Sequence, residues 1–504
     1  MKKVDASIQS WPLHGRRATQ ALEQSASEGL QPHALMQRAG LAVAKLALAL
    51  APHARTIWIA CGPGNNGGDG ALAAVHLTAW GKRVVLTGIG DPARAPPDAL
   101  AAWQQAARAG LIHEPLGEDA PQLEDGDICI DALLGVGASR APEGEMARCI
   151  ALLNVSAAAV LAIDLPSGLD ADTGSHAGSD AARARGGDNW VRAHWTLSLL
   201  TLKPGLFTSL GRDAAGEVWF DDLGVQAGSA NADAQLNARS GPRPRPHASH
   251  KGSYGDLAVV GGAPGMLGAA VLAATAALHG GSGRVFLCAL QPIDAGALIA
   301  HPELMPRALE AMDPAHTSVV CGCGGGDAVH AVLPRLLSRS RALVLDADAL
   351  NAIARDSALQ SLLLRRAAST GQVCTTVLTP HPLEAARLLG SSTTQVQANR
   401  LQAARDLAQR FRCVVVLKGS GTVIAASGQL PAINATGNAR LASAGTGDVL
   451  AGMIGARLAQ GQDAFSAACA AVYEHGFLAD RWPLGSALTA GALAKAVGGN
   501  PPTL

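Results

Sequence analysis

The feature that most constrains this chain is a regular alternation of short apolar runs with longer alanine-rich segments. The runs at 56–60, 159–163 and 342–345 consist almost entirely of apolar residues. Strands buried on both faces have this composition, because a strand with one face in water would alternate apolar and polar residues. Alanine-rich stretches such as 97–108 favour helices. Repeated strand–helix alternation predicts parallel sheets and an α/β fold.

The same pattern recurs in both halves of the chain. In the first half it predicts strands at 56–60, 83–86, 127–130, 159–163, 193–200 and 217–220, and helices at 71–80 and 97–108. In the second half it predicts strands at 257–260, 284–287, 318–320, 342–345, 373–378 and 413–417, and helices at 268–279, 382–389, 395–409 and 447–460.

A change in composition divides the chain. Residues 226–250 are rich in small and polar residues and contain three prolines, so they cannot build a core of their own. We therefore expect two domains, at 1–228 and 250–504, joined by an exposed linker at 229–249. The length of 504 residues also exceeds that of one ordinary domain. Each half has the content of a three-layer α/β sandwich, and the first is Rossmann-like.

Composition and charge exclude several classes of protein. Lys+Arg and Asp+Glu both count 40, which gives no electrostatic argument for a nucleic acid or an anionic membrane as partner. The N-terminal residues lack the apolar core of a signal peptide, and no segment offers the roughly 20 apolar residues of a membrane span. The nine cysteines are scattered and odd in number, against a disulfide framework. We expect a cytoplasmic protein without membrane or nucleic-acid partners.

The sharpest motif of the first half is the glycine-rich segment 61–70, Cys-Gly-Pro-Gly-Asn-Asn-Gly-Gly-Asp-Gly. It follows a predicted strand and precedes a predicted helix. Its glycines allow the backbone to approach a ligand, and a helix N-terminus offers free N–H groups to an anion. This favours a phosphate- or nucleotide-binding loop. The alternative is a tight strand–helix turn, which would not need two asparagines and an aspartate.

Polar residues also follow two further strands of the first half. Asp131 lies at the end of one strand, and Asp164 and Ser167 lie at the end of the next. Ligands of open α/β sheets bind outside the carboxyl ends of strands, so these residues and the glycine-rich segment predict one shared pocket. Asn66, Asp131 and Ser167 offer hard oxygen atoms suited to an alkali or alkaline-earth cation. Helix capping by the same residue types explains them equally well.

The most specific motif of the second half is the segment 442–452, in which Gly445-Thr-Gly447-Asp448 opens an apolar helix. N–H groups at a helix start can stabilise a phosphoryl group in transfer, and a carboxylate there can accept a hydroxyl proton. The alternative is an aspartate that caps its own helix. The segment Lys418–Thr422 ends a predicted strand in a glycine turn, which predicts a nucleotide-contacting loop. Asp346 and Asp348 follow another predicted strand. The position of His381 at a strand-to-helix turn favours substrate contact over a structural role.

Together the first-half segments resemble a known family. Residues 35–40, 65–69, 131–137 and 162–168 resemble the NAD(P)H-hydrate epimerase domain, over about residues 10–225. The resemblance implies potassium ligands at Asn66, Asp131 and Ser167, and an acid/base role for Asp164. It also implies a set of residues that bind the hydrated nucleotide: Asn65, Asn66, Gly67, Gly68, Asp69, Gly135, Val136, Gly137, Ala138, Ser139, Arg140, Ala141 and Asp164.

The second half resembles the ribokinase-like superfamily and, more closely, its ADP/ATP-dependent NAD(P)H-hydrate dehydratase branch. The matching segments are 250–255, 260–262, 268–269, 301–303, 345–350, 379–382, 418–422 and 445–452, within about 245–498. The resemblance implies that the nucleotide is bound by Lys418, Gly419, Ser420, Gly421, Thr422, Gly445 and Gly447. It implies that the hydrate is bound by Ala269, Gly322, Gly324, Gly326, His381 and Asp448. One departure is Cys323, which stands where the family usually has proline.

Both resemblances concern one metabolite, NADH or NADPH with water added across a ring double bond (NADHX and NADPHX). They imply a bifunctional repair enzyme that interconverts the R and S hydrates and then dehydrates the S form. The ring hydroxyl would be phosphorylated from ADP or ATP with Mg²⁺, Asp448 taking its proton, and phosphate would then leave. K⁺ in the first domain and a homo-oligomer are further expectations. The alternatives are a kinase of a small alcohol and a first domain that binds without catalysis.

Overall fold

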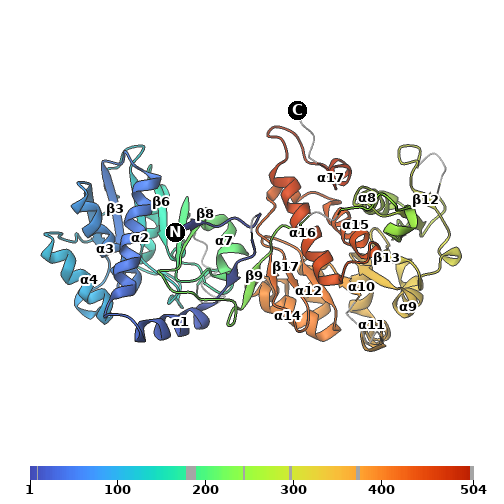
Figure 1. The fold of residues 1–504 in the computed structure, drawn as a ribbon, viewed down its shortest axis with the longest axis horizontal. Helices are drawn as coiled ribbons and strands as arrows, with labels where there is room; N and C mark the ends of the chain where they lie inside the picture. Colours follow the sequence, from blue (N-terminus) through green and yellow to red (C-terminus); the bar gives the residue numbers. More distant parts are fainter. Residues whose placement is uncertain (8, 178–188, 242–243, 294–297, 370–374, 500–504) are drawn as a thin grey trace. The chain divides into compact units, whose positions relative to one another are not determined.

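The computed structural model describes residues 1–7, 9–177, 189–241, 244–293, 298–369 and 375–499 (Figure 1). These residues form two compact units. The first consists of Met1–Asp5 and Trp11–Gln235, and the second of Ala6–Ser10 and Leu236–Leu504. Both units are mixed α/β, which confirms the expected fold class.

The first unit is built on one sheet whose strands run in the order β1-β8-β7-β6-β5-β3-β4. All neighbouring strands are parallel except β1, which pairs with β8 in the antiparallel sense. The strands are β1 (Lys2–Lys3), β3 (Thr56–Cys61), β4 (Arg83–Gly88), β5 (Ile128–Ala132), β6 (Ala159–Ile163), β7 (Trp195–Leu199) and β8 (Glu217–Asp221).

Helices cover both faces of this sheet. They are α1 (Arg16–Glu28), α2 (Ala34–Leu50), α3 (Asn65–Ala79), α4 (Pro97–Arg108), α5 (Glu145–Val155) and α7 (Gly211–Ala214). Ile57 and Ile59 of β3 pack with α2 and α3, whereas Trp58 between them packs with α5. Because side chains alternate along a strand, this arrangement gives the three layers expected from the fully apolar strands.

The second unit has a longer sheet with the order β12-β11-β10-β13-β14-β15-β16-β17-β18. Its strands are parallel from β12 to β16, and β17 and β18 continue it in the antiparallel sense. The strands are β10 (Asp256–Gly261), β11 (Arg284–Ala289), β12 (Met305–Pro306), β13 (Ser318–Cys321), β14 (Ala342–Leu345), β15 (Thr376–Leu378), β16 (Val414–Leu417), β17 (Val423–Ala425) and β18 (Ala432–Ile433).

One group of helices in the second unit forms the main core with the sheet: α8 (Leu267–His279), α15 (Thr446–Ala459), α16 (Ala464–Asp480) and α17 (Ala490–Ala496). Val414 and Val416 of β16 point into this core, and α15 contacts both α8 and α16 (Figure 1). The remaining helices contact one another: α9 (Val329–Arg339), α10 (Asp348–Arg355), α11 (Ser357–Ser369), α12 (Pro382–Leu389), α13 (Thr393–Ala398) and α14 (Arg400–Phe411).

Two predicted elements differ from the structure. Helix α3 begins at Asn65 rather than at residue 71, so the Asn-Asn-Gly-Gly-Asp motif forms its first turns and is not a loop. Glycine is a poor helix former, but packing outweighs this preference, because a Cβ at Gly67 would lie 1.9 Å from the carbonyl oxygen of Gly62. The helix expected at 395–409 is two helices, separated at Asn399, whose side chain accepts a hydrogen bond from the N–H of Gln402.

The expected linker at 229–249 is not exposed throughout, because residues 234–237 include a short strand and buried side chains, and its residues 242–243 lie outside the described residues. In strand β9 (Ala234–Leu236), Ala234 and Gln235 pair in the antiparallel sense with the two residues of β2 (Pro12–Leu13). Ala234 and Leu236 are buried, and Asn237 in the second unit donates its backbone N–H to the carbonyl of Ile433. Short apolar positions among many small and polar residues gave too weak a strand signal. Within the described ranges, no helix combines the length and the apolar character that crossing a bilayer requires.

Two candidate active sites at the carboxyl ends of the strands

The first unit contains a cavity of about 1170 Å³ beyond the carboxyl ends of β3, β5 and β6. It brings together most of the residues that the sequence predicted: Asn65, Asn66, Asp69, Gly135, Val136, Gly137, Ala138, Ser139, Arg140, Ala141 and Asp164. Gly67 and Gly68 do not line it. They are packing residues of α3, since a Cβ at Gly68 would lie 2.8 Å from the backbone of Ala99.

Asp164 is held in one conformation at the wall of this cavity. Its backbone is left-handed, with φ of +69°, a region that non-glycine residues rarely occupy. One carboxylate oxygen, Oδ2, accepts the backbone N–H of Val136 at 2.8 Å. The other, Oδ1, accepts a hydrogen bond from the ammonium of Lys203. Backbone and side chain are therefore both fixed.

Lys203 is a residue of the site that the sequence interpretation missed. Its side chain has no exposed surface, and its ammonium also donates to the carbonyl oxygens of Leu199 at 2.7 Å and Thr201 at 2.9 Å. A lysine is almost never fully buried unless it is paired. The available signal was a single lysine within the apolar stretch 197–207, directly before Pro204.

The three predicted cation ligands behave differently from one another. The hydroxyl of Ser167 donates to Oδ1 of Asp131 at 2.6 Å, and its backbone N–H donates to Oδ2 at 2.8 Å. Burial raises the pKa of Asp131 to about 6, although these bonds oppose the shift. Asn66 is buried, and neither polar atom of its amide has a hydrogen-bond partner in the described structure. Buried amides normally have partners, so the Oδ1 atom of Asn66 is suited to a ligand.

Five carboxyl groups line the cavity, those of Glu23, Asp69, Asp98, Glu143 and Asp164. Of these, Asp69 and Asp164 were predicted from the sequence and the other three were not. Burial, and next the charge of Asp164, raise the pKa of Glu23. The same two causes raise the pKa of Asp69 well above its usual range, with smaller contributions from Glu23 and Asp98. Carboxyl groups that are buried and repel one another in this way keep their protons to a higher pH than isolated carboxyl groups do.

In the second unit, Asp448 lies in the first turn of α15. This helix begins directly after Gly445, which has φ of +90°. Ligand atoms of Cys323, Asp346 and Asp448 lie within 4.8 Å of one another. Burial, followed by the charge of Asp346, raises the pKa of Asp448 to about 6. The carboxylate therefore lies beside the free N–H groups of a helix start, as the motif predicted.

Lys418 reaches this cluster from the end of β16. Its ammonium donates to Oδ1 of Asp346 at 2.6 Å, and Thr379 donates its hydroxyl to the same oxygen at 2.8 Å. Burial alone would lower the pKa of Lys418, but Asp346 and Glu384 outweigh it and raise that pKa. A Cβ at Gly447 would lie 3.4 Å from the lysine nitrogen, so the predicted nucleotide loop and the start of α15 meet here.

The loop after Lys418 is positioned by a second residue that the sequence interpretation missed. Arg400 is buried and donates to the carbonyl oxygens of Leu417 and Lys418, both at 3.1 Å. Within the predicted loop, Gly419 and Gly421 have φ of +136° and +63°, and Thr422 donates its hydroxyl to the carbonyl of Gly419. Ser420 completes the loop.

The glycine turn after β13 packs against the same region. Gly322, Gly324 and Gly326 all have positive φ, which explains why glycine stands there. A Cβ at Gly322 would lie 1.9 Å from the carbonyl oxygen of Asp346. A Cβ at Gly324 would lie 3.0 Å from that of Ala269, so this predicted residue of α8 lies against the turn.

The sequence left open whether His381 contacts the substrate or has a structural role, and the structure shows contacts of the structural kind. It is the N-cap residue of α12, and its Nδ1 accepts the backbone N–H of Leu383 at 3.1 Å. Its Nε2 lies 3.3 Å from Oε1 of Glu384. Burial, and next Lys418, lower the pKa of His381, whereas burial raises that of Glu384 to about 7. Nearly half of the His381 side chain is exposed, so capping leaves a face of the ring free.

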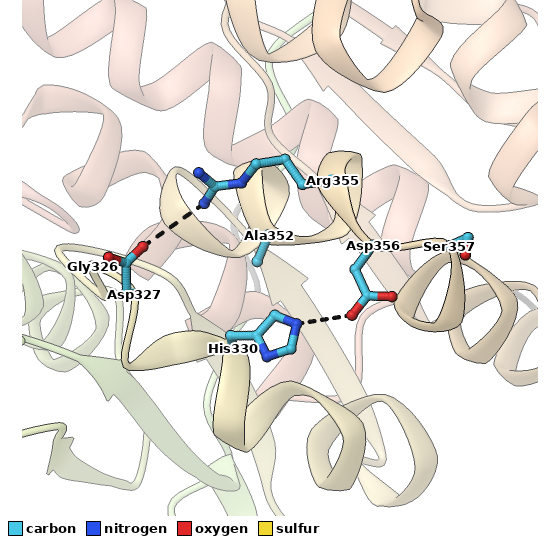
Figure 2. A pocket seen from close by; sticks show the side chains of 7 residues that line it. All are labelled: Gly326, Asp327, His330, Ala352, Arg355, Asp356 and Ser357. Carbon is cyan, nitrogen blue, oxygen red and sulfur yellow. Dashed lines mark hydrogen bonds and ion pairs between the residues drawn. The ribbon is translucent and has the colours of Figure 1, made fainter.

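Figure 2 shows a separate cavity of about 560 Å³ in the second unit. Two ion pairs lie in its lining, His330 with Asp356 at 2.8 Å and Arg355 with Asp327 at 4.0 Å. Gly326 is the one predicted site residue in its lining. The cavity therefore borders the glycine turn but does not include Asp448 or Lys418.

Comparison with known proteins gives matches over both units. A family model described as YjeF-related protein N-terminus matches residues 32–205, and one described as NAD(P)H-hydrate dehydratase matches residues 257–497. A protein of Escherichia coli named bifunctional NAD(P)H-hydrate repair enzyme is 36% identical over 466 residues, covering 90% of this chain and 85% of that protein. A protein of the same name from Coxiella burnetii is 36% identical over 488 residues, covering 93% and 94%.

Among solved structures, the chain is similar to an ADP/ATP-dependent NAD(P)H-hydrate dehydratase from Bacillus subtilis, co-crystallised with ATP and Mg²⁺. The sequence identity is 29% and the TM-score 0.44, over 50% of this chain and 91% of that one.

Proposed function

Because this chain belongs to the bifunctional NAD(P)H-hydrate repair enzymes, in which one polypeptide is both an epimerase and a dehydratase, we propose a role for each of its two sites. The cavity of the first unit interconverts the R and S hydrates of NADH and NADPH. The site at Asp448 dehydrates the S form with ADP or ATP. The observation that carries this proposal is the meeting of Asp448, Lys418 and the start of α15 in one place.

Dehydration at this site begins with phosphorylation of the ring hydroxyl. Asp448 accepts the hydroxyl proton while the oxygen attacks the terminal phosphorus of the nucleotide. The N–H groups of Gly445 and Gly447 at the start of α15 donate to the oxygens of the transferring phosphoryl group. Phosphate then leaves together with a proton from the neighbouring ring carbon, and the double bond is restored. A kinase fold thus performs an elimination, because phosphate is a better leaving group than hydroxide.

Lys418 and Mg²⁺ balance the charge of the phosphates. The Lys418 ammonium, fixed by Asp346, contacts them as part of the loop that ends at Thr422. The oxygens of Asp346 and of the phosphates suit Mg²⁺, whereas the thiol of Cys323 does not. When bound, Mg²⁺ would offset charge that develops on the phosphates.

The first site binds the hydrate between the segment Gly135–Ala141 and the start of α3, with Asp164 at the reacting carbon. The unpaired amide of Asn66 supports K⁺ there, since a cation would complete a coordination that the protein leaves open. Asp131 and Ser167 would add the remaining oxygen ligands. We also propose that the enzyme acts in the cytoplasm as a homo-oligomer, following the family resemblance.

The cation site predicts a K⁺ effect that depends on Asn66. Replacing choline chloride by KCl is expected to raise the melting temperature of the first unit and the rate of R-hydrate conversion. In Asn66→Ala both effects are lost, because stabilisation by a ligand requires its site. Asn65→Ala, whose side chain is exposed, is the matched control and retains the K⁺ effect on the melting temperature. A K⁺ response in Asn66→Ala would place the ion elsewhere.

The second site predicts a pH dependence. Asp448 acts as a base, so its carboxylate form is the active one, and its pKa is about 6. The kcat/KM for the S hydrate is therefore expected to be constant above that pH and to fall about tenfold per unit below it. A pH profile of initial rates measures this. A profile that stays flat from pH 7.5 to about pH 5 would contradict the role of Asp448 as a base.

The proposed dehydratase is tested with purified S-NADPHX, Mg²⁺ and either ADP or ATP. NADPH and inorganic phosphate are expected in equal amounts, and the nucleotide that supports the faster reaction is the donor. A small-alcohol kinase would instead form a stable phosphate ester and no NADPH. That product would overturn the dehydratase assignment.

A further inference from the structure

Asp164 is poorly suited to carry protons, although it lies at the reacting carbon of the proposed epimerase site. Both of its oxygens accept hydrogen bonds, one from Lys203 and one from the N–H of Val136. Both oxygens are therefore already engaged by donors of the protein, and Asp164 is the anion that pairs with the fully buried ammonium of Lys203.

Four other carboxyl groups line the same cavity. Asp98 is paired with His33, and Glu143 is exposed to solvent. Glu23 projects from α1 and Asp69 from α3, and both are half-buried. In the described part of the chain, neither of these two carboxyl groups makes a hydrogen bond or an ion pair with the protein. Both are partly exposed, so a ligand in the cavity can reach them. The backbone of Asp69 is held firmly, because α3 packs closely on α2. A Cβ at Gly40 of α2 would lie 3.2 Å from the carbonyl oxygen of Asp69.

We propose that Asp69 and Glu23 carry the protons of hydrate epimerisation, and that Asp164 remains a carboxylate throughout. The inference rests on the proposed epimerase function and assigns the acid and the base of that site. Asp69 and Glu23 would be catalytic residues, and Lys203 a positioning residue that acts through Asp164.

The chemistry of the hydrate requires one acid and one base. Water adds to an enamine at the carbon bonded to nitrogen, so the hydroxyl lies next to the ring nitrogen. One carboxyl group donates its proton to this hydroxyl, the carbon–oxygen bond breaks, and water leaves with the bonding pair. The nitrogen lone pair forms a carbon–nitrogen double bond, which gives a cation. A water molecule then adds to the opposite face and gives a proton to the other carboxylate.

The charges around the cavity support this division. Asp164 faces both groups and would stabilise the cationic intermediate as a fixed anion. Burial and Asp164 raise the pKa of both Asp69 and Glu23, and Asp98 adds to both shifts. Lys203 opposes the shift at Glu23, and Asp98 is itself paired with His33 at 2.5 Å. Glu23 and Asp69 therefore keep their protons to a higher pH than ordinary carboxyl groups do.

The test uses the full-length chain, because its dehydratase reports on epimerisation. NADPH formation is followed separately from R and from S hydrate, after subtraction of the rate without enzyme. Asp69→Asn and Glu23→Gln are each expected to lower conversion of the R hydrate by about 100-fold or more, with dehydration of the S hydrate as the internal control. The wild-type pH profile for R is expected to be bell-shaped, and each variant to lose one limb.

Folding and function are separated by two further measurements. Removal of a repelling carboxylate should leave the melting temperature of the first unit unchanged or higher, and Asp69→Glu should recover at least tenfold over Asp69→Asn. If either amide variant converts the R hydrate within threefold of wild type with both limbs intact, the proposal is overturned. If the wild-type chain itself does not convert the R hydrate, the epimerase function fails instead.

Discussion

The variant Asp448→Asn is expected to dehydrate the S hydrate about 10²–10⁴-fold more slowly than the wild type, the range for loss of a general base. Asparagine matches the size of aspartate but cannot accept the hydroxyl proton. The measurement is the initial rate of NADPH formation from purified S hydrate at saturating nucleotide, from the near-ultraviolet absorbance of NADPH.

Two controls belong to this experiment. Nucleotide binding should persist in Asp448→Asn, because Lys418, Asp346 and the glycines of the loop are unchanged. The variant should also still interconvert R and S hydrates, since the first unit folds around its own core. A rate within fivefold of wild type would show that another group accepts the proton.

The second large effect is expected from Lys203→Met. Removing one partner of a buried ion pair costs about 3–5 kcal/mol, because the other charge stays in the protein interior without compensation. For a unit of this size the melting temperature should fall by roughly 6–20 °C. Seven of the eight tryptophans lie in the first unit, so tryptophan fluorescence reports its unfolding. Conversion of the R hydrate should be lost, and dehydration of the S hydrate retained.

The double variant Asp164→Asn/Lys203→Met separates the pair from the packing of the lysine chain. With both charges gone, no unpaired ion remains, so the double variant should be more stable than Lys203→Met alone. Equal or lower stability of the double variant would show that the methylene packing of Lys203, rather than its charge, stabilises the unit.

Much of the fold could be predicted because buried parallel strands have a strong sequence signal. The strands β6 and β14 and the helices α4 and α12 have the predicted bounds. The start of α3 could not be predicted in the same way, because its glycines suggest a loop by propensity. Only the close approach of Gly67 to Gly62 and of Gly68 to the distant residue Ala99 shows why a helix with glycines is stable there. An apolar pattern does not contain these contacts.

The candidate sites were predicted where a motif gathers several polar residues, and missed where a single residue acts from a distance. Asp164 and Asp448 lie in dense motifs at strand ends, and the structure places both beside the residues expected near them. Lys203 and Glu23 stand alone in their segments, and their importance depends on burial and on the charges across the cavity. Burial and charge across a cavity depend on residues that are far apart in the sequence, so a local sequence pattern does not reveal them.

The central claim is that one chain repairs both hydrates with two separate sites. Its most direct test is the extent of NADPH recovery from an equal mixture of R- and S-NADPHX with Mg²⁺, K⁺ and the preferred nucleotide. The account predicts complete recovery by the wild type at a rate well above spontaneous epimerisation, and recovery of the S half alone at that rate by Lys203→Met. Recovery by the wild type that stops at the S half, or no recovery with either nucleotide, would contradict it.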